Sequence, residues 1–507
     1  MTTGSEPTPR LRVRRLRRLM FRVAAVLIGL LPFVVAEGVF TLLDWGQPDY
    51  TADPFIGFRN VRPLFVPSDD GARYEIPESR QAFFCPDSFA REKGPDEFRI
   101  FCLGGSTVQG RPFAIETSFT TWLELSLQAA EPTRTWDVVN CGGVSYASYR
   151  LVPILEEVLR HEPDLVILYT GHNEFLEDRT YSHIKRMPEV VAAPSSLLAR
   201  TRTYTLLREG FMRLRSQQQH TPDGFPVLRT ETDAMLDYRD GLDDYHRDDK
   251  WRRDTIDHFG YNLRRMVHLA DEADMPIVLV NPVSKLRDCP PFKTQHRDGL
   301  TPEELQRWEA LIDQATERRK TDLRGSATLL CQALEIDGQH AGLHYLLASH
   351  YDMLDKTDQA RKHYLLAKET DICPLRILEP MHEALIEIVR ETGTPMVDAR
   401  GSFEKLSRGH IPDGRYLVDH VHPSIEGHKL IAEWLIEDLA RQGVIKPVDG
   451  WKEVREQSYR DHFESLNDLY FLKGTQQLES LRYWTKGEAN GVPGKTPATR
   501  EHEGDGF

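Results

Sequence analysis

The chain has 507 residues, of which 40% are hydrophobic and 28% are charged. This composition is typical of a folded protein, and the length suggests two or three structural units. The net charge is −14 although seven arginines stand within the first 22 residues. The remainder is therefore strongly acidic, which argues against a nucleic-acid-binding protein.

The arginine-rich segment 1–19 precedes an apolar one. Residues 23–43 carry a single ionisable side chain, Glu37, and are long enough to cross a hydrocarbon core of about 30 Å. Arginines before such a span predict a cytoplasmic N-terminus and an exported body. We therefore expect a signal anchor at 20–43. The alternative is a signal peptide cleaved after Ala36, and both interpretations export the body.

From residue 96 onward, short apolar runs alternate with amphipathic segments. Repeated strand–helix units predict a parallel sheet covered by helices on both faces, that is, an α/β fold with a three-layer α/β/α sandwich. In such sheets, ligands bind outside the carboxyl ends of the strands. The expected strands are FRIFCL (98–103), TWDVVN (135–140), DLVILYTG (164–171), MPIVLVNP (275–282) and TPMVDARG (394–401). The expected helices between and beside them are 118–128, 149–163, 252–274 and 378–393.

Two further segments interrupt this pattern and are expected to be helical. The first, at about 176–250, is rich in Arg, Asp and His and is interpreted as an insertion or lid. The second, at 301–375, resembles a tetratricopeptide repeat, in which small residues let two helices approach and bulky ones fill the groove. An ordinary helical hairpin is the alternative. The residues on the repeat pattern are Leu347, Ala348, Tyr351, Ala360, Tyr364 and Ala367.

The six cysteines include no Cys-x-x-Cys pair. They are too sparse for a disulfide scaffold and lack the spacing of a metal site, so we predict neither a metal nor an organic cofactor. Cys102 and Cys141 lie in or at the end of expected strands and are predicted to be buried.

Four segments at strand ends carry side chains suited to one chemistry. A serine hydroxyl becomes a nucleophile when an imidazole takes its proton, and a carboxylate holds that imidazole in one tautomer. The oxyanion formed on attack needs fixed N–H donors. Ser106 alone is equally explained as a helix cap. The four segments together favour catalysis: GGST (104–107), NCGGVSYAS (140–148), GHNE (171–174) and DHVH (419–422).

These four blocks resemble those of the SGNH (GDSL-type) serine hydrolases, which are α/β/α sandwich esterases and acyltransferases. The resemblance covers roughly 96–290 and 376–442. It implies that Ser106 is the nucleophile, His422 the general base and Asp419 its orienting acid. It further implies that Asn173 and the backbone N–H of Ser106 form part of the oxyanion hole.

The subgroup that the chain most resembles consists of membrane-anchored bacterial proteins with tetratricopeptide repeats inside the hydrolase domain. This implies an inner-membrane protein with its body in the periplasm. The expected segments are a basic cytoplasmic segment (1–19), the anchor (20–43), a lead-in (44–95), the first hydrolase part (96–300), the repeat-like insertion (301–375), the last hydrolase part (376–445) and a C-terminal helical extension with a disordered tail (446–507).

The chain departs from the family pattern in three places. Gly105 stands where the family often has Asp, and Glu174 replaces the usual Asp after Asn173. In the second block, the oxyanion glycine position falls on Ser145, while Gly143 lies two residues earlier. The sequence leaves open which of these two supplies the N–H donor.

Other polar residues near the blocks have open roles. His420 and His428 lie close enough to His422 to compete as the base. His172, Arg150 and Arg376 are candidates for substrate binding; structural pairing is the alternative for the two arginines.

The expected function is an exported serine esterase acting on an O-acyl, above all acetyl, ester of a glycan. Within the enzyme class, the alternatives are a lipid or thioester acyl hydrolase and an O-acyltransferase. The alternative from another class is a non-catalytic envelope scaffold that binds a protein partner through the repeat-like segment. The expected partners are thus an acyl ester or polysaccharide, the membrane and a protein, with no nucleic acid.

Overall fold

The computed structural model describes residues 33, 36–40, 63–177, 203, 234–237 and 241–485. The chain divides into two compact units, Met1–Arg59 with Arg186–Val227, and Asn60–Lys185 with Leu228–Phe507. In the first unit, residues 36–40 are helical, and Glu37 accepts hydrogen bonds from the backbone N–H and hydroxyl of Thr203. Most of the expected anchor, most of the 176–250 insertion and the end of the tail lie outside the described residues. Within the described ranges, none of the helices combines the length and apolar composition that a membrane span requires.

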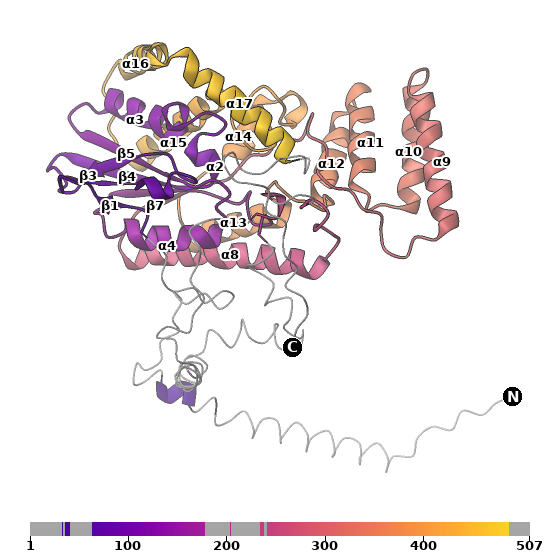
Figure 1. Ribbon diagram of the computed structural model, residues 1–507, viewed down its shortest axis with the longest axis horizontal. Coiled ribbons are helices and arrows are strands. Elements are labelled where there is room, and N and C mark those ends of the chain that lie inside the picture. Colours follow the sequence, from indigo (N-terminus) through magenta and orange to yellow (C-terminus); the bar gives the residue numbers. More distant parts are fainter. Residues whose placement is uncertain are drawn as a thin grey trace. The chain divides into compact units, whose positions relative to one another are not determined.

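The second unit contains a parallel sheet of five described strands (Figure 1). Their spatial order is β5-β4-β6-β7-β8. Since β5 and β6 flank β4 on opposite sides, the chain reverses its winding direction at β4, and ligands bind at such switch points. The strands are β4 (Glu97–Gly104), β5 (Thr135–Gly142), β6 (Leu165–Tyr169), β7 (Ile277–Val280) and β8 (Met396–Val397).

Helices cover both faces of this sheet, so the predicted α/β/α sandwich is confirmed. Helices α3 and α15 lie on one face, and α4, α8 and α13 lie on the other (Figure 1). The alternation of strands and helices expected from the sequence is therefore observed in the structure. The bounds are α3 (Phe119–Ala130), α4 (Ser148–Val158), α8 (Asp249–Glu272), α13 (Glu379–Thr392), α14 (Ala399–Leu406) and α15 (Ile425–Gln442).

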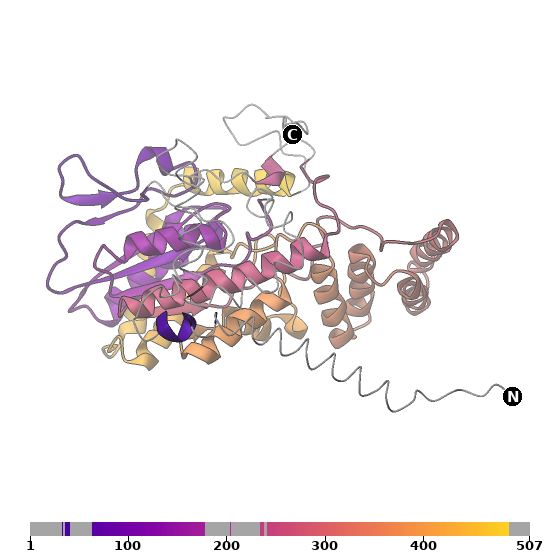
Figure 2. The same ribbon diagram turned by 90° about the horizontal axis from the view of Figure 1, so that it is seen from below.

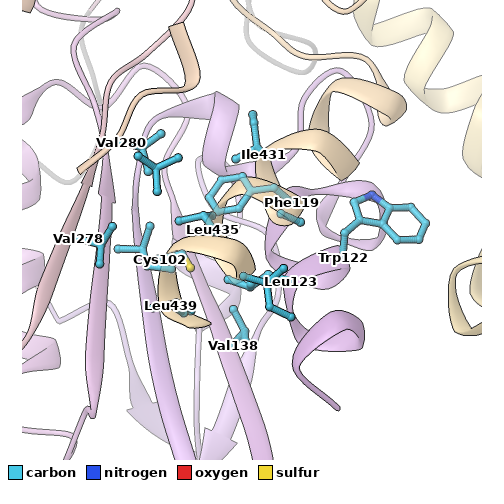
Figure 3. Close-up of a cluster of buried hydrophobic side chains, with 14 of the residues drawn as sticks. Cys102, Phe119, Trp122, Leu123, Val138, Val278, Val280, Ile431, Leu435 and Leu439 are labelled. Atoms are coloured by element: carbon cyan, nitrogen blue, oxygen red, sulfur yellow. The ribbon is translucent and has the colours of Figure 1, made fainter. Parts of the chain in front are cut away.

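The main hydrophobic core lies between the sheet and the α3/α15 layer. Cys102 and Val278 project from central strands toward Phe119 of α3 and Leu435 of α15 (Figure 3). Each large apolar side chain removed from water contributes roughly 1.5–3 kcal/mol. This layer therefore fixes the strand ends and the start of α15. Cys102 and Cys141 are fully buried, as predicted, and all six cysteines are free.

The lead-in contains a small antiparallel sheet that the sequence analysis missed. Its strands are short, and their residues are largely half-exposed, so they lack the apolar alternation that reveals a strand. The segment between β2 and β3 reaches the main domain, since Phe84 forms an antiparallel bridge with Gly143. The strands are β1 (Val66–Pro67), β2 (Arg73–Glu75) and β3 (Ser88–Ala90). Among the described residues, the short 3-10 helices are η1 (Glu78–Arg80), η2 (Ile115–Thr117), η3 (Met235–Asp237) and η4 (Arg408–His410).

The segment 301–375 is helical, as predicted. It forms consecutive packed helices, α9 on α10, α10 on α11 and α11 on α12, which extend away from the sheet (Figures 1 and 2). Helices α9 to α11 share a core around Trp308 and Leu330. The identification of these helices as a tetratricopeptide repeat stays a prediction. The bounds are α9 (Pro302–Arg318), α10 (Leu323–Ile336), α11 (Ala341–Met353) and α12 (Thr357–Glu369).

The segment that leaves the insertion, residues 371–378, is buried throughout. It leads into α13 and thus back to the sheet.

The C-terminal extension is helical as well, with α16 (Trp451–Ser465) and α17 (Asp468–Trp484). Tyr459 of α16 packs its ring on Trp122 of α3 and donates to the Trp122 carbonyl at 2.9 Å. In α17, Gly474 lies against the ring of Phe113, where a Cβ would come within 2.1 Å. The extension is therefore packed on the α/β/α sandwich and is not a separate arm.

Candidate active site

The first candidate residue, Ser106, begins the short helix α2 (Ser106–Gln109) directly after β4. Two glycines make this close packing possible. A Cβ on Gly104 would lie 2.2 Å from the Tyr169 carbonyl, and a Cβ on Gly105 would lie 2.5 Å from Nδ2 of Asn173. The two glycines therefore let the turn that carries Ser106, after β4, pack closely against Asn173, which follows β6.

Ser106, His422 and Asp419 form one continuous hydrogen-bond chain. Nε2 of His422 lies 2.7 Å from Oγ of Ser106, and Nδ1 of His422 lies 2.7 Å from Oδ2 of Asp419. The carboxylate can only accept, so Nδ1 carries the proton and Nε2 is left to accept from the hydroxyl. The three side chains are almost fully buried. The sequence predicted this set, and the structure brings its members together.

The turn that carries Asp419 and His422 holds itself in place. Oδ1 of Asp419 accepts the backbone N–H groups of Val421 and His422 at 2.9 and 2.8 Å, and Leu417 bridges Pro423. Ser424 then caps α15 through the N–H of Gly427. Each of these partners is within six residues along the chain, which explains why a short motif could reveal the site.

The charge state of Asp419 follows from its neighbours. Burial acts to raise its pKa, but His422, His420 and the hydrogen bonds from His422 outweigh burial and hold the pKa well below its usual range. Asp419 therefore stays ionised, and its negative charge stabilises a protonated His422.

The competing histidines do not hydrogen-bond to Ser106. Nδ1 of His420 is 3.5 Å from Asp419, its ring packs on Phe292, and burial lowers its pKa to about 4. Nδ1 of His428 accepts the N–H of Phe119 at 3.2 Å, and burial lowers its pKa to about 3. Both are neutral at pH 7, and the ring of His420 lies 5.9 Å from that of His422.

The structure distinguishes Gly143 from Ser145 as candidates for the backbone N–H donor of the oxyanion hole. The N–H of Gly143 donates to the carbonyl of Gly104 at 2.9 Å, so it continues the sheet pairing and has no free hydrogen. Ser145 has φ of 61°, and its N–H has no hydrogen-bond partner among the described residues. Beside it, Nδ2 of Asn173 donates to the Tyr146 carbonyl at 3.0 Å. An amide nitrogen carries two hydrogens, which leaves Asn173 one more to donate.

Glu174, which replaces the usual Asp, contacts the end of the turn that contains Ser145. Its carboxylate accepts the N–H and the hydroxyl of Ser148, both at 2.8 Å, at the start of α4. Burial raises its pKa to about 7, against the lowering effect of these two hydrogen bonds. The residue after Asn173 therefore anchors the helix that follows the turn.

The two arginines expected as substrate-binding candidates have internal partners instead. Arg150 forms a buried, bidentate pair with Glu177 at 2.7 Å for both bonds. Arg376 donates to the carbonyls of Lys285 and Cys289 at 3.1 Å and lies 3.5 Å from Asp371. Their guanidinium groups are thus engaged in internal contacts, which matches the structural-pairing alternative for both arginines.

His172 lies beside this site as a neutral side chain. Its Nδ1 accepts the N–H of Ile377 at 3.3 Å, and burial holds its pKa well below the usual range. The hydrogen therefore sits on Nε2, which has no partner within the described part of the chain. Ile377 belongs to the buried segment 371–378, so the exit of the helical insertion reaches the residue next to Asn173.

Sequence reasoning missed the part that the lead-in plays here. The carbonyl of Phe83 accepts the N–H of Val144 at 2.8 Å, and Arg80 donates to the hydroxyl of Tyr146 at 3.2 Å. The lead-in thus holds the turn that contains Ser145. In the sequence, this contact is indicated only by the adjacent apolar residues Phe83 and Phe84 before Cys85. Among the described residues, no group of three or more His, Cys, Asp or Glu side chains is arranged to hold a metal ion.

No protein-family model and no curated protein matches the chain. Among solved structures, it is similar to a protein from Desulfitobacterium hafniense described as lipolytic and of the G-D-S-L family, at 12% identity, 67% of this chain, 99% of that chain and a TM-score of 0.30. It is also similar to a lipase/acylhydrolase from Enterococcus faecalis, at 12% identity, 70% and 100% coverage and a TM-score of 0.31. A third is an acetylxylan esterase from Geobacillus stearothermophilus, at 14% identity, 69% and 96% coverage and a TM-score of 0.30. Scores this low carry no argument about the activity of this chain.

Proposed function

We propose that this protein is a serine esterase or acyl hydrolase with Ser106 as nucleophile, His422 as general base and Asp419 as orienting acid. The observation that carries this proposal is the chain of two 2.7 Å hydrogen bonds that joins the three side chains. Those distances are within the reach that proton transfer requires.

In the first step, Oγ of Ser106 attacks the carbonyl carbon of the ester while its proton passes to Nε2 of His422. The negative charge that develops on the carbonyl oxygen needs donors that are already in place. We assign these to the N–H of Ser106, the N–H of Ser145 and the second hydrogen of the Asn173 amide. Asp419 stabilises the imidazolium that forms.

In the second step, His422 returns its proton to the leaving alcohol, and the acyl group stays on Ser106 as an ester. Water then attacks this acyl-enzyme with His422 again as the base, which releases the acid. A sugar hydroxyl in place of water would give acyl transfer through the same atoms, so the proposed roles are compatible with both reactions.

We propose an O-acetyl ester of a glycan as the substrate. Its support is the resemblance of the four blocks to a family whose exported members commonly add or remove acetyl groups on polysaccharides, together with the arginine-then-apolar N-terminus. The same N-terminus supports a proposal of an inner-membrane anchor with the body in the periplasm. The helical insertion is proposed to bind a protein partner.

The test is labelling of the full chain in detergent with a fluorophosphonate, read by mass spectrometry. We expect an adduct on Ser106 that is lost in Ser106→Ala and in His422→Ala. Ser349→Ala and His246→Ala change the same residue types outside the site and are expected to label normally. A folded wild-type chain without adduct would overturn the proposal and favour the scaffold alternative.

A further inference from the structure

Arg111, which the assignments above do not use, contacts Ser106 through the backbone. The backbone N–H groups of Gly110 and Arg111 both donate to the carbonyl of Ser106 at 3.1 Å. Gly110 has φ of 101°, and a Cβ there would lie 2.5 Å from the Ala114 carbonyl. The chain therefore turns back sharply after α2, and this turn fixes the backbone of Arg111 one hydrogen bond from Ser106.

The side chain of Arg111 is oriented by Gln109. Its Nε donates to Oε1 of Gln109 at 3.2 Å, while Nε2 of Gln109 donates to the carbonyl of Phe83 at 2.8 Å. That same carbonyl accepts the N–H of Val144, the residue before Ser145. Gln109 is 5% exposed. The guanidinium is thus tied both to the nucleophile turn and to the turn of the proposed oxyanion donor.

The two terminal nitrogens of Arg111 form no hydrogen bond and no ion pair with any residue that the structure describes. Arg150 and Arg376 differ in this respect, because each faces a buried carboxylate. Arg111 is only partly exposed to solvent, and burial lowers its pKa. An arginine stays charged in proteins, and a partly buried charge without a counter-ion is costly.

We propose that Arg111 binds an anionic group of the substrate, a carboxylate or a phosphate, carried beside the ester bond that Ser106 attacks. This inference rests on the proposed function and narrows its substrate class to acid-bearing esters. The planar guanidinium offers its terminal N–H groups as a fork, which matches both anions. Gln109 is a positioning residue, since it touches Arg111 and not the substrate.

The first experiment compares acetate release from an acidic ester, 4-acetoxybenzoate, and from its uncharged methyl ester, with the full chain in detergent at low ionic strength. Arg111→Gln is expected to raise KM for the acid by about tenfold or more, because a charge-assisted hydrogen bond is lost. The methyl ester is expected to change less than twofold. Arg111→Lys keeps the charge without the fork and is expected to fall between.

4-Acetoxyphenyl phosphate in the same series distinguishes the two anions, since the preferred group shows the larger change in Arg111→Gln. Arg441→Gln, at an exposed arginine of α15, is the matched control and is expected to change neither ester. An equal effect of Arg111→Gln on the charged and neutral esters, or no effect on either, would overturn the proposal.

The second experiment separates this proposal from the proposed function. Ser106→Ala cannot form the acyl-enzyme, so binding of 4-acetoxybenzoate to it is measured by calorimetry without any reaction. We expect the Kd to rise about tenfold or more when Arg111→Gln is added. An unchanged Kd would overturn the role of Arg111 even if labelling of Ser106 succeeds. A changed Kd would support that role even if labelling fails.

Discussion

The two halves of the candidate site are built in different ways. The base half, Asp419 to His422, closes on itself, since Asp419 accepts N–H groups from residues two and three positions along the chain. The donor half, around Ser145, depends on distant segments, because the lead-in holds Val144 and Glu174 holds the start of α4. A self-contained turn is visible in the sequence as a motif, whereas a turn assembled from elsewhere is not.

The largest effect is expected from breaking the base half. Asp419→Asn keeps the shape but removes the charge that holds Nδ1 of His422 protonated, so kcat is expected to fall about a thousandfold or more. The measurement is kcat for an acetyl ester. The double variant with His422→Ala is expected to be no slower than His422→Ala alone, since the two act as a unit. Additive losses would contradict a shared hydrogen-bond chain.

The next effect concerns the donor half. Gly105→Ala would place a Cβ 2.5 Å from Nδ2 of Asn173, so the amide must move. We expect kcat to fall by about a hundredfold, as for the loss of one oxyanion donor, and Asn173→Ala to give a similar loss. Circular dichroism checks the fold of both. Retention of full activity in Gly105→Ala would exclude Asn173 as a donor.

A smaller effect is expected from pH. Burial raises the pKa of Glu174 in the folded protein to about 7. Protonated Glu174 therefore contributes to the free energy of unfolding, and this contribution is fully present below the pKa of the unfolded state, about 4.3. This contribution is lost as pH rises through about 7. Glu174→Gln is therefore expected to lose less stability than the wild type between pH 5 and pH 8, by a few kcal/mol at most. Urea unfolding at both pH values measures this, and parallel curves for the two proteins would contradict it.

The smallest effect is expected at Ser145, which has φ of 61°. Ser145→Gly keeps the backbone N–H and relieves a left-handed conformation that costs a residue with a side chain about 1–2 kcal/mol. Its larger unfolded-state entropy offsets part of this gain. We expect a change in unfolding free energy within about 1 kcal/mol and full activity. A loss of activity beyond tenfold would show that the hydroxyl itself takes part.

The comparison also explains what the sequence could predict. Strand–helix alternation predicted the sheet and its layers because apolar periodicity records burial. The spacing of Asp419 and His422 predicted their contact because both lie on one turn. Ser106 was predicted through its position after a strand, since parallel strands end at one edge of the sheet.

Other features depended on partners that periodicity does not record. The sequence left open whether Arg150 binds substrate or pairs structurally, because its ion pair is with Glu177, 27 positions away. Arg111 was overlooked because its distinction is the lack of a counter-ion, which only the folded surroundings reveal. The lead-in has little apolar alternation, so its contact with Val144 could not be inferred. The expected anchor and the repeat identity of the insertion stay predictions.

The hydrogen bond between Ser106 and His422 spans 316 positions of the chain. At a synthesis rate of roughly 5–20 residues per second, His422 emerges some fifteen seconds to one minute after Ser106. In the proposed mechanism, Ser106 has no general base throughout that interval, so a nascent chain cannot form the acyl-enzyme. The helical insertion between β7 and β8 lengthens this delay. On that mechanism, Ser106 becomes reactive only after the segment that carries His422 has been synthesised and has docked on the sheet.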